Sequence, residues 1–147
     1  MRYILDTNVV LHIVRNSSLW HKVKSEYRLD LPENKMFISI VTYAEIKSLA
    51  KQLSWGKSKM GKLETVLGNF PTLYINNDVV ESYIEIDVFS QGKDKMNPLP
   101  SSISSRNMGK NDLWIAATTK YIQAELITMD NDFIHLNEAF FKVHIIR

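Results

Sequence analysis

The chain has 147 residues, of which 45% are hydrophobic and 23% charged, as expected for one soluble globular domain. It contains no cysteine, which excludes disulfides and thiolate metal sites, and its net charge is only +2. No apolar run reaches the roughly 18–20 residues that span a bilayer. Asp6 and Asn8 interrupt the N-terminal apolar segment, so we expect no signal peptide, no membrane association and a cytoplasmic protein.

Short apolar runs and amphipathic segments alternate along the chain. Five runs rich in Ile, Val, Phe or Tyr are typical of buried strands. In chain order they are Arg2–Leu5, Met36–Ile40, Thr72–Ile75, Glu125–Met129 and Lys142–Ile146. The segments with helical periodicity are 19–29, 42–53 (with Thr42 as a candidate cap), 57–70, 78–89 and 111–124.

This alternation predicts βα units and a parallel sheet. Because crossovers between parallel strands are right-handed, helices should cover both faces of the sheet. We therefore expect an α/β fold, a three-layer α/β/α domain spanning residues 1–147 around a central five-stranded, mainly parallel sheet. In such sheets functional groups gather beyond the carboxyl ends of the strands.

One stretch, 92–109, has the composition of a linker, with two prolines and four serines. A mobile connection and a binding loop both fit it. This stretch and the residue that follows it contain only one acid, Asp94, but four basic residues: Lys93, Lys95, Arg106 and Lys110. Such a basic stretch is either a solvated face or a surface that meets the RNA or DNA backbone.

Five acids stand at positions that local sequence rules explain only in part. Asp6 follows the first strand, and Asp130 and Asp132 follow the fourth; Asp112 opens a helix, and Glu45 lies on a helix with no basic neighbour three or four residues away. Each has an ordinary explanation: a helix cap, a favourable helix-end charge, a turn or partial exposure. Together, however, these positions can converge on one rim of a parallel sheet.

Converged carboxylates repel one another and need a positive partner or protons. All-oxygen ligation suits Mg²⁺ or Mn²⁺, whereas the absence of cysteine and of paired histidine spacing argues against zinc. We expect Thr7, Asn8, Thr42 and Thr128 to give polar support to the acids. A hard divalent ion held in this way can bind phosphate and activate water.

Four segments together resemble the PIN-domain family, and most closely the VapC-like ribonuclease toxins within it. They are "ILDTNVVL" near the start, "ISIVTYAEI" some 30 residues later, "NDLWIAATT", and "LITMDNDF" near the end. The similarity covers nearly the whole chain in the expected order.

The resemblance implies roles for particular residues. Asp6, Glu45, Asp112 and Asp130 match the family's catalytic and metal-binding acids, and Asp132 matches a less uniform fifth acid. Thr128 matches a frequent serine or threonine of the family.

The resemblance also implies an activity and partners. It implies a Mg²⁺- or Mn²⁺-dependent endoribonuclease that cuts RNA such as tRNA or an rRNA loop. It also implies that the protein forms a homodimer and is neutralised by a cognate antitoxin. We expect Lys93, Lys95, Arg106 and Lys110 to contact the RNA.

Other classes of protein share part of this acidic pattern. A receiver-type signalling domain needs adjacent acids after the first strand, but Thr7 follows Asp6. A haloacid-type phosphatase needs a second Asp two residues after Asp6, where Asn8 stands. A catalytically idle PIN scaffold that binds RNA or protein is the main alternative; it would be expected to have lost an acid.

Overall fold

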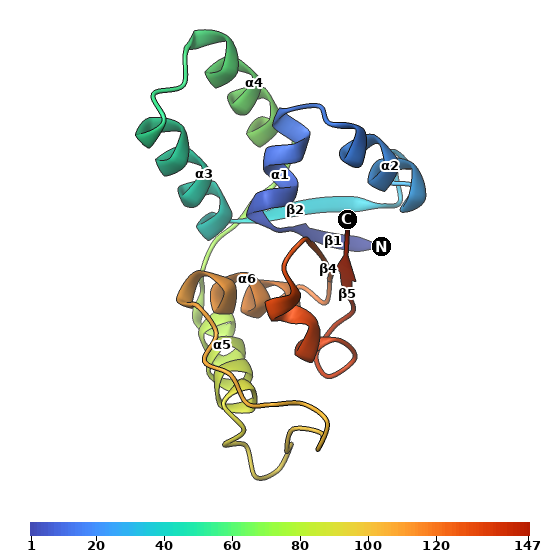
Figure 1. Cartoon of the computed structure of the whole chain (residues 1–147), viewed down its shortest axis with the longest axis vertical. Coiled ribbons are helices and arrows are strands. Elements are labelled where there is room, and N and C mark those ends of the chain that lie inside the picture. Colours follow the sequence, from blue (N-terminus) through green and yellow to red (C-terminus); the bar gives the residue numbers. More distant parts are fainter.

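A five-stranded parallel sheet forms the centre of the computed structural model, which describes all 147 residues (Figure 1). The strand order is β3-β2-β1-β4-β5, and every neighbouring pair is parallel. The strands are β1 (Arg2–Leu5), β2 (Lys35–Ser39), β3 (Thr72–Leu73), β4 (Glu125–Thr128) and β5 (Val143–Ile145). The predicted α/β fold is confirmed, and the sheet is parallel throughout.

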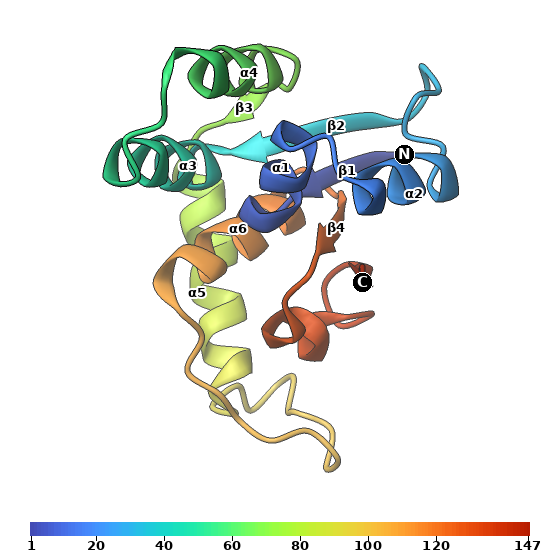
Figure 2. The same ribbon diagram turned by 45° about the horizontal axis from the view of Figure 1, so that its top comes forward.

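Helices cover both faces of this sheet, as the right-handed crossovers require. Four α-helices pack on one face: α1 (Thr7–Val14), α2 (Ser18–Glu26), α3 (Ile40–Gln52) and α4 (Lys57–Gly68). The other face is covered by α5 (Asn77–Ser90), α6 (Lys110–Tyr121) and the short 3₁₀ helix η1 (Asn131–Leu136). Figures 1 and 2 show the α1–α4 group and the α5–α6 pair on opposite sides of the strands. No helix is both long and apolar enough to cross a bilayer.

Side-chain alternation along the strands divides the core into two clusters. In β1, Tyr3 and Leu5 face the α1–α4 cluster, whereas Ile4 faces the α5–α6 cluster. In β4, Leu126 and Ile127 divide in the same way. Because successive side chains of a strand point to opposite faces, a continuous apolar run is what a strand buried on both faces requires.

Some element boundaries differ from those predicted. Helix α3 begins at Ile40, capped by Ser39, whose side chain accepts from the backbone N–H of Val41. Thr42, the predicted cap, is instead fully buried in the first turn. Strand β3 ends at Leu73 rather than Ile75, because Tyr74 and Ile75 lie in solvent. The turn expected after β4 is the 3₁₀ helix η1.

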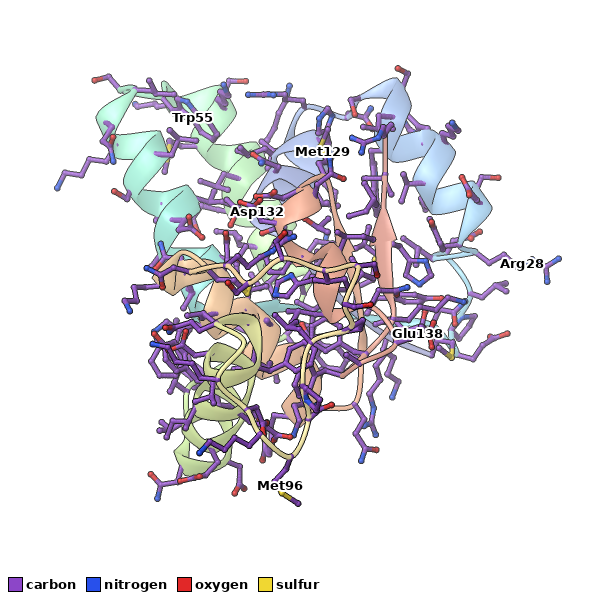
Figure 3. The ribbon with its side chains drawn as sticks, turned by 60° about the horizontal axis from the view of Figure 1, so that its bottom comes forward. Arg28, Trp55, Met96, Met129, Asp132 and Glu138 are labelled. Atoms are coloured by element: carbon purple, nitrogen blue, oxygen red, sulfur yellow. The ribbon has the colours of Figure 1, made fainter.

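The connection between α5 and α6 is both extended and anchored. It runs past the end of α5 before it returns to α6 (Figures 1 and 2). Met96, 94% exposed, marks its outer part and lies far from Asp132 (Figure 3). The returning arm is held where the backbone N–H of Arg106 donates to the carbonyl of Ser90 over 2.7 Å.

Candidate active site

Asp6 is both a helix cap and a buried acid at the end of a strand. It follows β1, caps α1, and accepts the backbone N–H of Thr7 at 2.7 Å. The second carboxylate oxygen accepts the hydroxyl of Thr128 at 2.7 Å, and the side chain is only 5% exposed. The two explanations for this acid are therefore compatible, since one oxygen serves the cap and the other faces the neighbouring strand.

The parallel pairing of β1 and β4 determines which residues meet Asp6. Leu5 is in register with Ile127, so the residues that follow both strands reach the same edge of the sheet. Thr128 ends β4 and, besides donating to Asp6, accepts the backbone N–H of Asp130 at 3.0 Å. Asp130 in turn caps η1 by accepting the N–H of Asp132 at 2.8 Å. One threonine hydroxyl thus connects two of the predicted acids.

Three carboxylates come together beside this pair. Asp112, in the first turn of α6, and Asp130 and Asp132 each offer one oxygen, and these oxygens lie within 4.8 Å of one another. Asp112 and Asp130 are half-buried, whereas Asp132 is exposed. Oxygen atoms at this spacing, from three different side chains, can surround one small cation.

Glu45 reaches the same region from α3. Its Oε1 accepts the hydroxyl of Thr7 at 2.9 Å, and the same hydroxyl lies 3.4 Å from that of Thr42. This contact from α1 gives the carboxylate of Glu45 a hydrogen-bond partner, since its own helix offers no basic neighbour three or four residues away. Glu45 does not belong to the three-acid group, but its charge acts on both Asp6 and Asp112.

Two acids of the site, Asp6 and Asp112, have raised pKa values. Burial raises the pKa of Asp6; the hydrogen bonds from Thr128 and Thr7 lower it, and the charges of Glu45 and Asp130 raise it further. Burial, followed by the charges of Asp6 and the other acids, raises the pKa of Asp112 to about 6. Deprotonation of the site therefore accumulates negative charge that a cation would offset.

A groove of about 530 Å³ adjoins the acids between α1, α3 and the start of α6. The polar part of its lining consists of Thr7, Asn8, Glu45, Ser48, Gln52 and Asn111, and the rest includes Leu11 and Leu49. The structure thus places Asn8 in the groove wall, with no hydrogen bond to an acid. The groove is large enough for side chains of a partner or for part of a substrate.

The four predicted RNA-binding cations fall into two groups. Lys110 opens α6 two residues before Asp112, and Arg106 donates from Nη1 to the carbonyl of Asp132 at 3.3 Å. Lys93 and Lys95 are exposed at the other end of the connection, near its outer part. Only the first pair therefore lies beside the acids.

Sequence reasoning missed a buried polar pair behind the site. Ser90 Oγ, at the end of α5, lies 2.7 Å from Nε2 of His135 in η1, and both residues are almost fully buried. Burial and the charge of Arg106 lower the pKa of His135 to about 4, so the ring is neutral at pH 7. The residues are 45 positions apart and carry no motif, so no sequence signal could have paired them.

A parallel α/β domain with an acidic cluster at the carboxyl ends of its strands defines a class that includes metal-dependent nucleases. The PIN domain family model matches residues 3–139, and the chain belongs to the PIN-domain family. It is 30% identical over 129 residues to Ribonuclease VapC1 of Haemophilus influenzae strain R2866, which covers 87% of this chain and 86% of that protein. This similarity places the chain among VapC-like members of the family, as the sequence motifs predicted.

Solved structures show the same fold. The VapBC2 structure from Rickettsia felis, bound to a promoter DNA fragment, matches with a TM-score of 0.78 and 18% identity over 100% of both chains. The VapBC-1 structure from nontypeable Haemophilus influenzae matches with a TM-score of 0.70 and 22% identity, covering 99% of this chain and 98% of that one. At this level of identity the likeness concerns the fold alone.

Proposed function

We propose that the chain, acting as a single nuclease domain over residues 1–147, is a Mg²⁺- or Mn²⁺-dependent endoribonuclease toxin. The observation that carries the proposal is the meeting of Asp112, Asp130 and Asp132 within 4.8 Å beside Asp6 and Glu45. The similarity to proteins named Ribonuclease VapC1 supports RNA as the substrate.

The residues present fit a hard divalent cation. The donors are all carboxylate oxygens, which Mg²⁺ and Mn²⁺ prefer, and neither a thiolate nor a histidine ring belongs to the group. Burial, followed by the charges of Asp6, Asp130 and the other acids, raises the pKa of Asp112, and a bound cation would favour its ionised form. Asp112, Asp130 and Asp132 would hold the ion, with Asp6 and Glu45 as the adjoining acids. When bound, such an ion polarises the phosphodiester and lowers the pKa of water.

The protein's own contribution is to fix the acids in place. Thr128 holds the carboxylate of Asp6 and the backbone of Asp130 through one hydroxyl. Thr7 holds Glu45 from the first turn of α1 and packs against Thr42. Because these threonines lie on buried elements, the carboxylates have little freedom to move apart when they ionise. This preorganisation suits a site that must receive an ion and a phosphate together.

Cleavage of single-stranded or loop RNA tests the proposal. We expect Mg²⁺- or Mn²⁺-dependent hydrolysis that leaves a 5′-phosphate and a 3′-hydroxyl, and loss of most activity in Asp6→Asn with the fold retained by circular dichroism. Undiminished cleavage in excess EDTA would refute the role of the metal.

The alternative, an idle scaffold, predicts a different result from the same assay. An idle PIN domain would bind RNA without cutting it, with or without divalent ions. Asp112, Asp130 and Asp132 lie together, and the charges of Asp6 and Glu45 act on Asp112, which favours the enzyme. Binding without cleavage in the presence of both metals would establish the scaffold instead.

A cognate antitoxin is the proposed partner. The solved structures named above are described as VapBC assemblies, and VapBC-5 from Mycobacterium tuberculosis is described as a member of a toxin–antitoxin family. The apolar residues Val23 of α2 and Leu63 and Leu67 of α4 are buried in the core, so they are not available to such a partner. The groove between α1 and α3 is the better place for a partner helix, because it opens beside Glu45.

Substitution within the groove tests the partner site without disturbing the core. Ala44 and Ser48 line the groove and are exposed, so Ala44→Arg and Ser48→Arg should fill it and weaken antitoxin binding at least tenfold. The matched control is Ser58→Arg, at an exposed position of α4, and this variant should bind the antitoxin as wild type does. Growth arrest that persists although the two proteins form a stable complex would show that the antitoxin does not cover the active site.

We also propose a homodimer. Ile84 and Val88 are 49% and 37% exposed one turn apart on α5, an arrangement that a second copy could cover. Ile84→Lys should then give a monomer by light scattering, whereas Ile134→Lys, at an equally exposed isoleucine of η1, should not. A wild-type monomer at high concentration would contradict this proposal.

A further inference from the structure

The long connection between α5 and α6 forms a second hollow beside the acids. This hollow, of about 330 Å³, is lined by residues 104–108 on one side and by Asp132 on the other. Asp132 also belongs to the three-acid group, so the hollow and the proposed metal site share a wall. Whatever occupies the hollow would lie directly next to a phosphate held at the acids.

The wall formed by the connection is fixed in place. Arg106 is tied at both ends, because its backbone N–H donates to Ser90 and its guanidinium donates to the carbonyl of Asp132. Met108 is 5% exposed, and its sulfur accepts the hydroxyl of Ser90 at 3.4 Å. Ser90 also contacts the buried ring of His135. The hollow is therefore a preformed feature of the fold.

Packing of the two arms of the connection gives further rigidity. Gly92 adopts a φ of +70°, and a Cβ at this position would lie 3.3 Å from the Cβ of Ser105. A side chain here would be strained by its backbone conformation and would press on the neighbouring arm. The glycine thus lets the outgoing arm approach the arm that lines the hollow.

The lining of the hollow is polar, and most of its polar side chains have no hydrogen-bond partner within the protein. Ser104, Ser105 and Asn107 are exposed, and their side chains form no hydrogen bond within the protein. Hydroxyl and amide groups both donate and accept, which is what the edge of a nucleobase requires. The planar guanidinium of Arg106 adds a surface on which a base can stack. An apolar side chain would find only Met108 to contact.

We propose that this hollow is a nucleobase subsite, which binds the base of a nucleotide next to the cleaved phosphodiester. The proposal rests on the ribonuclease function proposed above, and names a specificity determinant within it. Proteins read RNA sequence mainly from unstacked bases of single strands and loops, so the subsite takes an unpaired base and not a duplex. Asn107 is assigned the reading role, and Arg106 the role of positioning the wall.

Cleavage of a randomised single-stranded RNA library, followed by sequencing of the product ends, tests the subsite. Wild type should show a base preference at one position beside the cut. Asn107→Ala should lose most of that preference and cut the preferred sequence about tenfold more slowly, because the side chain that contacts the base edge is gone. Ser102→Ala, an exposed serine of the same connection outside the hollow, should keep both rate and preference.

The possible outcomes separate the two proposals. Wild type that does not cut the library with Mg²⁺ or Mn²⁺ contradicts the nuclease function. Wild type that cuts with no positional preference, or Asn107→Ala that keeps the wild-type preference, overturns the subsite and leaves the nuclease function standing. A uniform loss of rate with unchanged preference also overturns it, because Asn107 would then act on the backbone or on folding. Melting curves of each variant show which case applies.

Discussion

The hydroxyl of Thr128 donates to the carboxylate of Asp6 over 2.7 Å, across the pairing of β4 with β1 and over 122 positions of sequence. Both side chains are buried, and the same hydroxyl oxygen accepts the N–H of Asp130. One atom therefore sets the relative position of two acids that follow different strands. It also lowers the pKa of Asp6 against the effect of burial.

Thr128→Val removes this hydroxyl with little change of shape. We expect a loss of about 1–3 kcal/mol in the free energy of unfolding, because a buried carboxylate oxygen loses its donor. The pKa of Asp6 should rise, since the hydrogen bond that lowers it is gone, and the acid limb of the activity profile should move to higher pH.

Thr119→Val is the matched control for Thr128→Val. It removes a buried hydroxyl that donates only to a helix carbonyl, that of Ile115. It should cost about 1 kcal/mol of stability and leave the pH profile unchanged. If Thr128→Val had the wild-type pH profile, the hydroxyl would have no part in tuning Asp6.

Asp112→Asn should stabilise the protein in the absence of divalent ions. The folded-state pKa of Asp112, about 6, lies above its ordinary value of 3.8, so the folded state favours the protonated form. The protonated carboxyl of Asp112 therefore contributes to the free energy of unfolding. This contribution is complete below about pH 4 and is lost as the pH rises through 6. At pH 7 we expect the variant to gain about 1–2 kcal/mol after allowance for solvent screening, and no gain at pH 4.

Thermal melting between pH 4 and 8 measures this effect. Asp78→Asn removes the acid from the corresponding first turn of α5, away from the cluster, and accounts for the loss of the helix-end interaction. Added Mg²⁺ should raise the melting temperature of wild type and of Asp78→Asn more than that of Asp112→Asn. Equal pH dependence in all three proteins would mean that neither burial nor the neighbouring acids raise the pKa of Asp112.

Lys110→Gln should weaken RNA binding more than Lys95→Gln. Lys110 lies two residues before Asp112, whereas Lys95 lies at the outer part of the connection. Loss of one phosphate contact to a single strand flattens the log–log dependence of affinity on salt by about 0.7. We expect this change for Lys110→Gln and none for Lys95→Gln, measured by fluorescence anisotropy with an inactive Asp6→Asn background. The reverse order would place the RNA along the outer connection.

The sequence predicts the strands and the positions of the acids because these depend on local patterns. A strand buried on both faces needs a continuous apolar run, and Arg2–Leu5 is observed as predicted. The rule that carboxyl ends of parallel strands share an edge brings Asp6 and Asp130 together without knowledge of the register. The sequence predicts Thr128 as polar support near the end of that strand, but the pairing of β4 with β1 that brings its hydroxyl to Asp6 comes from the structure.

The features that sequence reasoning missed depend on contacts between distant segments. Ser39 rather than Thr42 caps α3, because the helix begins directly where β2 ends and both residues can cap. The buried pair Ser90 and His135 has no local pattern. The course of the connection after α5 is set by the Arg106–Ser90 hydrogen bond, which composition alone does not predict. Its hollow beside Asp132 therefore emerged only from the structure.

We propose that the carboxylates act through a divalent ion to cut RNA. The most direct test is the single-turnover cleavage rate as a function of Mg²⁺ concentration, in wild type and in Asp130→Asn. The asparagine keeps an oxygen to cap η1 but removes one charge from the site. The control is Asp30→Asn, which changes an exposed acid. Asp30 stands two residues after Arg28, and Figure 3 shows Arg28 far from Asp132. We predict rates that saturate with Mg²⁺ in wild type and in Asp30→Asn, and a loss of about 100-fold or more in Asp130→Asn at the same concentration. Equal rates with and without Mg²⁺, or equal rates in Asp130→Asn and wild type, would contradict the account.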